Sequence, residues 1–253
     1  MNVLDVKGLT MRFGGLTAVS DFNLTLQKGE LVGLIGPNGS GKTTVFNMIT
    51  GFYKPTQGQI IVNDRDVTGL RPDQVTALGT ARIFQNSRLF RELPVLDNVL
   101  IGYHVRLRSS PFDAVLRLHG YAKEEKQALD EAMTLLTGLG LADQVDEIAG
   151  SLPYGLQRKL EVARALATKP SLLLLDEPAT GMGSEETAEM MDFILKVRDD
   201  FDMTILLIEH HMQVVMGICE RMAVLNYGKT IAKGRPEEIQ NNREVIEAYL
   251  GAN

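Results

Sequence analysis

The sequence contains one cysteine, no long apolar run and no excess of basic residues. The single cysteine, Cys219, excludes an internal disulfide and fits a reducing compartment. Because it follows the apolar run 214–218, we expect a buried structural thiol. No apolar run approaches the ~18 residues that a membrane-spanning helix needs, and the N-terminus lacks the pattern of a secretion signal. If the protein works at a membrane, other chains must therefore provide the membrane part.

The charge balance is acidic, with a net charge of -6 and a pI near 5.3. This balance argues against a broad nucleic-acid surface, although it leaves room for a local basic groove. The chain has 253 residues, enough for one large domain or two small ones, and it shows neither an internal repeat nor a low-complexity linker. Its hydrophobic share of 44% and charged share of 23% are ordinary for a soluble globular protein.

The most informative stretch is glycine-rich and reads Gly36-Pro37-Asn38-Gly39-Ser40-Gly41-Lys42-Thr43. Its spacing, G-x-x-x-x-G-K-T, is that of a phosphate-binding loop, and it stands between a predicted strand at 30–35 and a predicted helix opening at 44–49. Glycines let successive N–H groups converge on a phosphate, and the helix N-terminus adds donors and partial positive charge. Lys42 would reach the β- and γ-phosphates, and the Thr43 hydroxyl would bind Mg²⁺. An ordinary glycine-rich turn would not need all these parts, so the sequence predicts a nucleotide site.

A pair of carboxylates follows a predicted buried strand. Four leucines at 172–175 fit a central strand that is covered on both faces, and Asp176 and Glu177 come at its carboxyl end, where open α/β sheets bind ligands. Asp176 would hold Mg²⁺, directly or through water, and Glu177 would polarise the water that attacks the γ-phosphate. The alternative is that the strand simply ends in a polar turn before Pro178. The phosphate loop upstream disfavours this purely structural interpretation.

Three further residues are candidates for the nucleotide site, and each could instead have an ordinary structural or surface role. Phe13, upstream of the phosphate loop, could stack on a base, or it could be a core aromatic on a strand. Gln85 ends a predicted strand at 80–85, and its amide oxygen could ligate Mg²⁺ or position a water, or it could be an ordinary loop residue. His210 follows a predicted strand at 203–208 and could contact the γ-phosphate and orient the attacking water, or it could be structural.

The remaining pattern divides the chain. Residues 2–35 alternate apolar and polar positions with turns at 14–15 and 28–29, which predicts antiparallel strands. Helical spacing takes over within 94–150, at 96–107 and 123–139, and the charged and histidine residues there, including His104 and His119, favour a solvated face. A hairpin is predicted at 221–231 and a helical tail at 236–250.

The order of these features resembles that of the ATP-binding-cassette (ABC) ATPases. The loop at 36–43, Gln85, the run 152–160, the pair Asp176-Glu177 and His210 occur in the order of that family, and the resemblance covers essentially the whole chain. Further stretches are similar to one branch, the ATPase subunits of branched-chain amino acid importers, which pair with a second, similar ATPase. These stretches are 86–90, 152–155, 181–182, 208–210 and 248–251.

The resemblance implies an α/β fold: a P-loop NTPase core of the ABC type with an antiparallel β-subdomain and an inserted helical subdomain. The chain would be a single ABC ATPase domain over 1–253, with the core at 1–86 and 160–253 and the helical subdomain at about 87–159. ATP and Mg²⁺ would be the cofactors, with ATP held between two cassettes in a head-to-tail dimer. The implied catalytic residues are Glu177, His210, Gln85 and Lys42. The implied nucleotide-binding residues are Phe13, the loop 36–43 and Thr44, while Tyr154 and Gly155 would act on the nucleotide of the facing subunit. The implied metal ligands are Thr43, Gln85 and Asp176.

The implied partners are a second ABC ATPase, two transmembrane permease subunits and, indirectly, an extracytoplasmic solute-binding protein, with no nucleic acid. The cassette pair would be a heterodimer, or a homodimer in isolation. It would lie at the cytoplasmic face of the inner or plasma membrane, held by the permeases, which would dock on the helical subdomain and the Gln85 loop. Closure of the dimer on ATP and opening after hydrolysis would drive the permeases between inward- and outward-facing states.

The chain departs from the family pattern in its signature stretch and at two further positions. The family signature L-S-G-G-Q is here Leu-Pro-Tyr-Gly-Leu at 152–156, so Pro153 offers no hydroxyl and Leu156 no amide. Gly183 stands where an Asp is usual, and His211 stands where an Asp often follows the switch histidine. Because Pro153, Leu156 and Gly183 would act on the facing subunit's nucleotide, we hypothesise that the two ATP sites of a heterodimer are unequal. The alternative is that this branch tolerates these residues with no asymmetry.

The predicted function is ATP hydrolysis that powers the import of branched-chain or other hydrophobic amino acids. An importer of urea or short amides stays open, since the cassette never touches the solute. A soluble ABC-type switch in DNA repair or translation is a second alternative, although such proteins usually carry tandem cassettes or long coiled-coil inserts. A third, a regulatory subunit that binds nucleotide without turnover, is disfavoured by the presence of Glu177 and His210.

Overall fold

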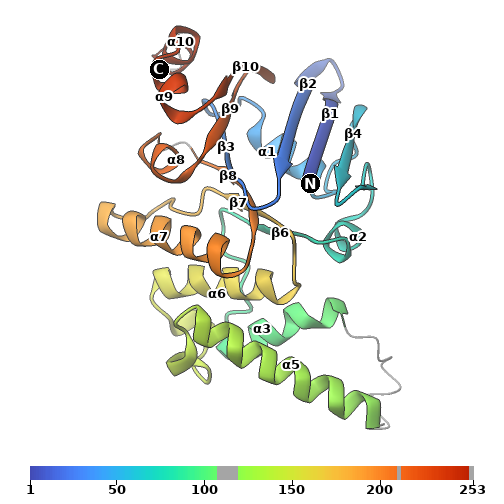
Figure 1. Cartoon of the computed structure of the whole chain (residues 1–253), viewed down its shortest axis with the longest axis vertical. Coiled ribbons are helices and arrows are strands. Elements are labelled where there is room, and N and C mark those ends of the chain that lie inside the picture. Colours follow the sequence, from blue (N-terminus) through green and yellow to red (C-terminus); the bar gives the residue numbers. More distant parts are fainter. Residues whose placement is uncertain (107–118, 210–211, 251–253) are drawn as a thin grey trace. The chain divides into compact units, whose positions relative to one another are not determined.

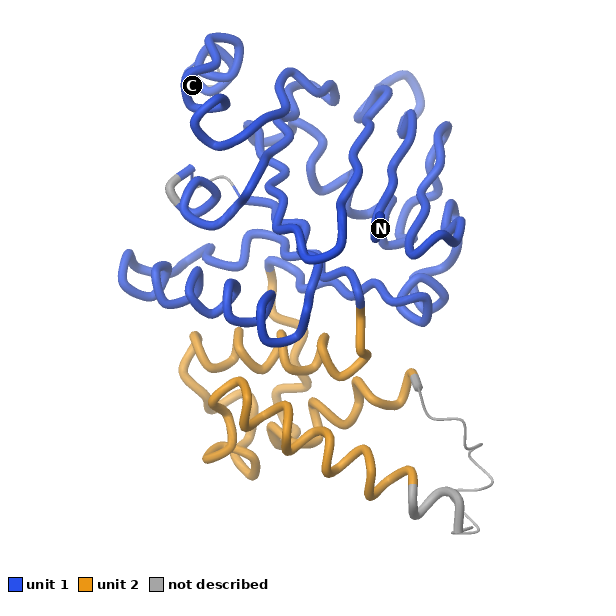
Figure 2. Tube along the Cα trace, viewed as in Figure 1, with its two compact units in different colours: residues 1–85, 171–253 blue, residues 86–170 orange. Residues whose placement is uncertain are grey.

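The computed structural model describes residues 1–106, 119–209 and 212–250. It divides into two compact units, residues 1–85 with 171–253, and residues 86–170 (Figure 2). The second unit begins where the helical segment was expected to begin, but it continues to Pro170 instead of ending near 159. The reason is that α6 (Tyr154–Ala167) packs against α3 (Val95–Tyr103) inside this unit.

The first unit contains two β-sheets (Figure 1). One has the strand order β2-β1-β4-β5 and is antiparallel, as predicted for the first two strands of the range 2–35. Residues 31–35 of that range instead belong to the other sheet, where they pair in parallel with both neighbours. The other has the order β10-β9-β3-β8-β7-β6, parallel from β9 to β6 and antiparallel between β10 and β9. The strands are β1 (Asn2–Phe13), β2 (Leu16–Gln27), β3 (Leu31–Ile35), β4 (Gln57–Val62), β5 (Arg65–Asp66), β6 (Thr80–Ile83), β7 (Leu172–Asp176), β8 (Thr204–Ile208), β9 (Arg221–Asn226) and β10 (Lys229–Gly234).

The core explains how the phosphate loop is fixed. Strands β3, β7 and β8 are buried at every residue, as expected for central strands covered on both faces. On one face, Leu172 and Leu174 of β7 share a core with Val45 and Phe46 of α1 (Lys42–Ile49). Residues of the antiparallel sheet complete this core, so α1 lies between the two sheets (Figure 1). Both elements that flank the loop, β3 and α1, are therefore held by packing.

Several element boundaries differ from the sequence predictions, and those near the site and in the tail matter most. Helix α1 begins at Lys42, two residues earlier than expected, so the loop lysine is the first helical residue. Strand β6 ends at Ile83, and Gln85 lies beyond the strand rather than at its last position. The tail 236–250 forms two helices, because Asn242 interrupts it and caps the second one. The helices of this unit besides α1 are α2 (Pro72–Ala77), α7 (Ser184–Asp200), α8 (Met212–Ile218), α9 (Pro236–Gln240) and α10 (Arg243–Leu250).

The second unit is helical. Helices α3 and α6 meet at Gly102, where a Cβ atom would lie 2.5 Å from the Arg164 carbonyl oxygen. The buried Asn98 side chain accepts from the N–H of Phe90 at 2.9 Å and donates to the carbonyl oxygen of Pro94 at 3.0 Å, so it fixes the segment that leads into α3. The remaining elements are α5 (His119–Gly138) and the short 3₁₀ helices η1 (His104–Arg106), η2 (Ala142–Gln144) and η3 (Ala149–Ser151).

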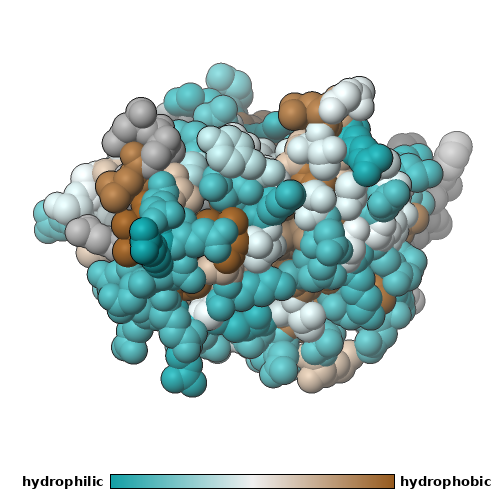
Figure 3. All heavy atoms as spheres, turned by 90° about the horizontal axis from the view of Figure 1, so that it is seen from above, coloured by the Kyte–Doolittle hydropathy of each residue, from teal (hydrophilic) through white to brown (hydrophobic). Residues whose placement is uncertain are grey.

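The surface and the thiol agree with the composition. In the described parts of the chain, no helix has both the length and the apolarity to span a bilayer. The face in Figure 3 is mainly hydrophilic, with hydrophobic residues in separate groups. Cys219 is buried, as expected, and burial raises the pKa of its thiol. His104 is exposed, as predicted, whereas the side chain of His119 lies outside the described part of the chain.

Candidate functional site

The phosphate loop joins the end of β3 to the start of α1. Its first glycine, Gly36, has φ +148°, and a Cβ atom there would lie 2.0 Å from the carbonyl oxygen of Leu225 in β9. No larger residue fits at Gly36 unless β9 moves. The buried Lys42 ammonium donates to the carbonyl oxygens of Gly36 at 2.7 Å and Pro37 at 3.0 Å. Its positive charge is therefore held within the curve of the loop, where phosphate would be recognised.

The charges of the predicted site act on one another. Burial lowers the pKa of Lys42, while the negative charges of Glu177 and then Asp176 oppose this shift. Such coupling requires proximity, because Coulomb interactions weaken with distance and solvent screening. The fold thus brings the phosphate-loop lysine and the two carboxylates after β7 into one cluster.

A cavity of about 300 Å³ opens over the phosphate loop. Its size lies at the small end of the range for ligand pockets. The lining combines backbone-rich loop residues, a carboxylate and two exposed apolar or aromatic side chains: Asn38, Gly39, Ser40, Gly41, Lys42, Thr43, Thr44, Glu177, Leu16, Thr17, Ala18 and Tyr227. Most of the predicted phosphate-binding residues and the proposed base therefore face the same space.

The aromatic side of the cavity differs from the sequence prediction. Phe13 is not among the residues that line the cavity. Its ring meets the ring of Tyr53 edge-on, with the ring centres 5.4 Å apart. Base stacking by Phe13 therefore stays a prediction. Tyr227, which the sequence reasoning did not single out, lines the cavity and is 85% exposed. The next residue, Gly228, donates its N–H to the Ser40 carbonyl oxygen at 2.9 Å, which ties this turn to the loop. The signal available in the sequence was an aromatic residue directly before a turn glycine.

Asp176 is the last residue of β7, and its side chain is 8% exposed. Its Oδ2 atom accepts a hydrogen bond from Nη2 of Arg82 at 2.6 Å. The same guanidinium donates to Oδ1 of Asn47 in α1 at 2.7 Å. Sequence reasoning identified Asp176 but not Arg82, whose only signal was a charge within an otherwise uncharged predicted strand.

Glu177 is fixed by its backbone and by two side chains. It has φ +49°, a conformation uncommon for residues other than glycine, and its N–H donates to the Ile208 carbonyl oxygen at 2.9 Å. Its Oε2 atom accepts from Nε2 of Gln85 at 2.8 Å and from the Thr180 hydroxyl at 3.2 Å. The structure thus brings Gln85 and Glu177 together, and it holds a carboxylate at the cavity in the manner that a general base requires.

The end of β8 adds a residue that the sequence reasoning passed over. His210 and His211 lie outside the described residues, so the role of His210 stays a prediction. Glu209, directly before them, is completely buried, and its Oε1 atom accepts from the N–H of Ala179 at 3.2 Å. It connects the end of β8 to the loop that follows Glu177. The available signal was a carboxylate directly after a mainly apolar strand, but the functional role was assigned to the adjacent histidine.

The residues predicted to act on a facing subunit's nucleotide lie in the second unit, at the start of α6. Pro153 precedes the helix without a side-chain cap, and Tyr154 is its first residue. The Tyr154 hydroxyl accepts from Nε of Arg158 at 3.0 Å, and the guanidinium lies 5.2 Å from the ring centre. A Cβ atom at Gly155 would meet no described atom within 4 Å, so its backbone is open to approach.

The donor set around the cavity fits a magnesium–nucleotide complex. Thr43 is exposed on the first turn of α1, and Asp176 uses only Oδ2 in its ion pair. Within the described residues, no group of three or more His, Cys, Asp or Glu forms a metal cage. Mg²⁺ is commonly bound by one or two protein oxygens together with phosphates and waters, which is the kind of site that Thr43 and Asp176 can form.

Comparison with protein families gives two matches. A model described as "ABC transporter" matches residues 19–180, and one described as "Branched-chain amino acid ATP-binding cassette transporter" matches residues 229–253. The chain is 48% identical to the high-affinity branched-chain amino acid transport ATP-binding protein LivG of Escherichia coli K12, over 98% of each chain. It is 43% identical to the corresponding protein BraF of Pseudomonas aeruginosa, also over 98% of each.

Solved structures agree with these relationships. The fold is similar to the ADP conformation of an ATP-binding cassette of an ABC transporter, with a TM-score of 0.86, 30% identity and 99% of each chain covered. A nucleotide-free ATP-binding cassette matches with a TM-score of 0.84 and 31% identity, over 98% of this chain and 99% of the other. The α/β architecture and the order of the site residues are therefore those of a known group of nucleotide-binding proteins.

Proposed function

This chain belongs to the ABC transporter family, and from that membership we propose that it is the ATP-hydrolysing subunit of an importer for branched-chain amino acids. Membership makes it an ATP-binding subunit and an ATPase. The proposal of the solute is supported by the relatives LivG and BraF, whose names describe branched-chain amino acid transport. The match of residues 229–253 to a branch-specific model supports the same choice.

One observation carries the proposed chemistry: Glu177, held by Gln85, lines the same cavity as the phosphate loop. The N–H groups of the loop and the Lys42 ammonium would bind the phosphates of ATP, and Phe13 or Tyr227 would contact the nucleoside. Glu177 would accept a proton from the attacking water, and the hydrogen bonds from Gln85 and Thr180 orient its carboxylate for that task. His210 would orient the same water.

Mg²⁺ would be held by Thr43 and Asp176, with Gln85 as a further ligand, and would neutralise charge on the β- and γ-phosphate oxygens. The exposed Thr43 hydroxyl and the Oδ1 atom of Asp176 are the oxygens that the chain offers for this purpose. Lys42 contributes a fixed positive charge on the loop side of the cavity. These residues stabilise charge rather than form covalent bonds, which is how proteins catalyse phosphoryl transfer.

As an ATP-binding subunit of a transporter, the chain works with membrane permease subunits. We propose that there are two such permeases, that the unit 86–170 contacts them, and that the chain is held peripherally at the cytoplasmic face of the inner or plasma membrane. A second, similar ABC ATPase would form the head-to-tail partner, with Tyr154 and Gly155 acting on the nucleotide of that partner. An extracytoplasmic solute-binding protein would deliver the solute.

The test is to tag the chain, extract membranes in mild detergent, and identify the proteins that copurify. Two permeases and a second cassette ATPase are expected. The purified complex in liposomes should then show ATP-dependent uptake of leucine, isoleucine or valine rather than urea or a short amide. Soluble partners alone would reject the transporter assignment in favour of a soluble switch, and binding of ATP without turnover would identify a regulatory subunit.

A further inference from the structure

Arg82 is a buried arginine that the proposed reaction does not use directly. It lies in β6, where its Cα atom is paired with that of Leu174 in the parallel neighbour β7. Residues i and i+2 of a strand share a face, so Leu174 and Asp176 lie on the same face of β7. The Arg82 side chain, which is 5% exposed, reaches diagonally across the sheet to the second of these residues.

The partners of the guanidinium come from several elements. Nη2 donates to Oδ2 of Asp176 at 2.6 Å, and Nη1 donates to Oδ1 of Asn47 at 2.7 Å. The guanidinium carbon lies 4.5 Å from the centre of the Phe84 ring and 5.5 Å from that of the Phe46 ring. Arginine can hold two acceptors and stack on aromatic rings at once because its guanidinium is planar and carries five donors.

These contacts bridge the two elements that offer metal ligands. Asn47 belongs to α1, the helix whose first turn carries Lys42 and Thr43. Asp176 ends β7 and is the carboxylate proposed to hold Mg²⁺. The bridge Asn47–Arg82–Asp176 therefore fixes the separation of the Thr43 hydroxyl from the Asp176 carboxylate. It occupies Oδ2 of Asp176, while Oδ1 accepts no hydrogen bond from any described residue.

We propose that Arg82 is a positioning residue for the metal–nucleotide complex, because it holds Asp176 and α1 in the arrangement that the metal requires. This inference rests on the proposed function. Partners that orient a metal ligand from behind commonly tune metal affinity, even though they never touch the metal. A lysine at the same position keeps a positive charge beside Asp176, but it lacks the forked guanidinium that also reaches Asn47. The Arg82→Lys variant therefore distinguishes the effect of positioning Asp176 from the effect of the positive charge.

The experiment compares the full-length wild-type chain with Arg82→Gln, Arg82→Lys and Asn47→Ala. The probe is Mn²⁺, whose binding to the complex with ADP is followed by electron paramagnetic resonance. Binding of a fluorescent ADP analogue in EDTA gives the metal-independent affinity. For Arg82→Gln we expect Mn²⁺ affinity to fall about tenfold or more while ADP affinity in EDTA is unchanged. Arg82→Lys and Asn47→Ala should show smaller losses of Mn²⁺ affinity in the same direction.

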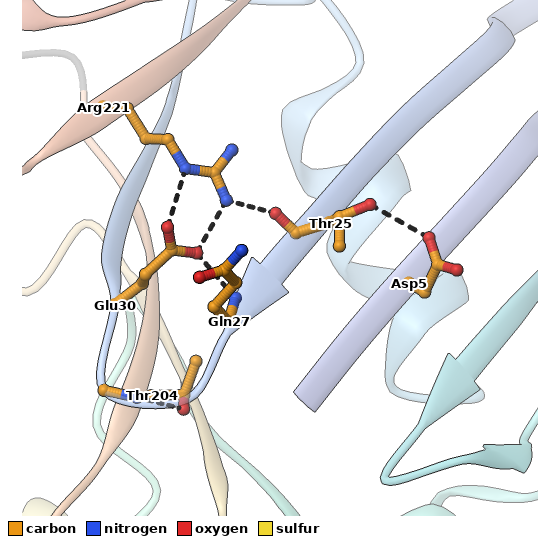
Figure 4. Close-up of polar contacts among 7 residues, drawn as sticks. Asp5, Thr25, Gln27, Glu30, Thr204 and Arg221 are labelled. Atoms are coloured by element: carbon orange, nitrogen blue, oxygen red, sulfur yellow. Dashed lines mark hydrogen bonds and ion pairs between the residues drawn. The ribbon is translucent and has the colours of Figure 1, made fainter. Parts of the chain in front are cut away.

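Arg221→Gln is the matched control. Arg221 forms an ion pair with Glu30 at 2.7 Å in the same unit (Figure 4). Neither residue lines the cavity over the phosphate loop. Its loss should lower the melting temperature without changing Mn²⁺ affinity.

Unchanged Mn²⁺ affinity in Arg82→Gln, or an equal loss of ADP affinity in EDTA, would overturn the proposal and leave Arg82 as a purely structural ion pair. If Arg82→Gln does not fold, Arg82→Lys and Asn47→Ala decide by the same criterion. Failure of the wild-type chain to bind ADP at all would instead reject the proposed function, which keeps the two failures distinguishable.

Discussion

The Nε2 atom of Gln85 donates a hydrogen bond of 2.8 Å to Oε2 of Glu177, a residue 92 positions away in the chain. Gln85 follows β6 and Glu177 follows β7, and these strands are parallel neighbours in the larger sheet. The carboxyl ends of two adjacent strands thus place an amide against the proposed base. This hydrogen bond restrains the orientation of the Glu177 carboxylate.

Replacement of Gln85 by Ala should therefore slow hydrolysis more than it weakens ATP binding. Glu177 would keep Thr180 as a donor but lose its shorter hydrogen bond, and misplacement of a catalytic group can reduce the rate roughly 10- to 100-fold. Steady-state ATPase assays on the purified transporter should show this loss in kcat, with KM for ATP little changed. Gln59→Ala, which removes an exposed hydrogen bond to Asp66, is the control and should behave as wild type. A Gln85→Ala complex with wild-type kcat would contradict this role.

The two glycines at the start and centre of the phosphate loop should differ in their tolerance of a methyl group. At Gly39, with φ +75°, a Cβ atom would meet no described atom within 4 Å, so Gly39→Ala should cost about 1–2 kcal/mol from the left-handed backbone alone. At Gly36 the Cβ atom would also overlap the Leu225 carbonyl oxygen, and the overpacking should bring the loss to ~3 kcal/mol or more. Urea unfolding of the chain without nucleotide measures both. Equal losses would show that β9 yields easily to the added atom.

The sequence was sufficient for the parts of the site that depend on local pattern. The phosphate loop needs only a strand, glycines and a helix start, and Asp176-Glu177 needs only the end of an apolar strand, so both could be placed from residues alone. Arg82 and Glu209 could not, because their roles come from contacts with Asp176 and Ala179 that only the sheet order and the loop path create.

The same distinction applies to the fold. Periodicity predicted the strands and the helical segment, but it did not predict that α6 belongs to the helical unit, because that assignment depends on packing against α3. Nor could periodicity find the break at Asn242, where a side-chain cap ends one helical pattern and begins another. Tyr227 reaches the cavity because its turn is tied to Ser40, a contact between segments far apart in the sequence.

The ion pair of Arg221 with Glu30 should make stability depend on acid pH (Figure 4). Burial raises the pKa of Glu30, but hydrogen bonds from Arg221 and the Gln27 N–H, with the charge of Arg221, outweigh it, so the pKa lies below its ordinary value of 4.5. A lowered pKa in the folded state means that this stabilisation is complete above the ordinary value and is lost as the pH falls through the lowered one. The effect should be modest, because both side chains are partly exposed.

Urea midpoints measured from about pH 6 to pH 3 test this expectation. The wild-type midpoint should fall more steeply with acid than that of Glu30→Gln. Glu247→Gln is the control: its partner Arg243 is 91% exposed, and its loss should leave the pH dependence unchanged. Parallel curves for wild type and Glu30→Gln would mean that the carboxylate contributes nothing measurable.

The departures from the family signature predict unequal ATP sites in a heterodimer. The groups that this chain would use on its own nucleotide are in place where the structure describes them: the loop and Glu177 line one cavity. The groups that it would offer to its partner's nucleotide are altered, since Pro153 precedes α6 without a side-chain cap and the Gly183 N–H is bound by Glu186 at 3.0 Å. Loss of a preorganised donor at a developing charge can cost on the order of 10²-fold in rate. Hydrolysis should therefore occur mainly at the site built on this chain's phosphate loop.

Single-turnover assays on the heterodimeric transporter should lose most activity with Glu177→Gln in this chain alone, and much less with the equivalent change in the partner. Glu185→Gln, an exposed change on α7, should leave turnover intact. Survival of most activity in Glu177→Gln would exclude the asymmetry, because the partner's site would then be working at a comparable rate.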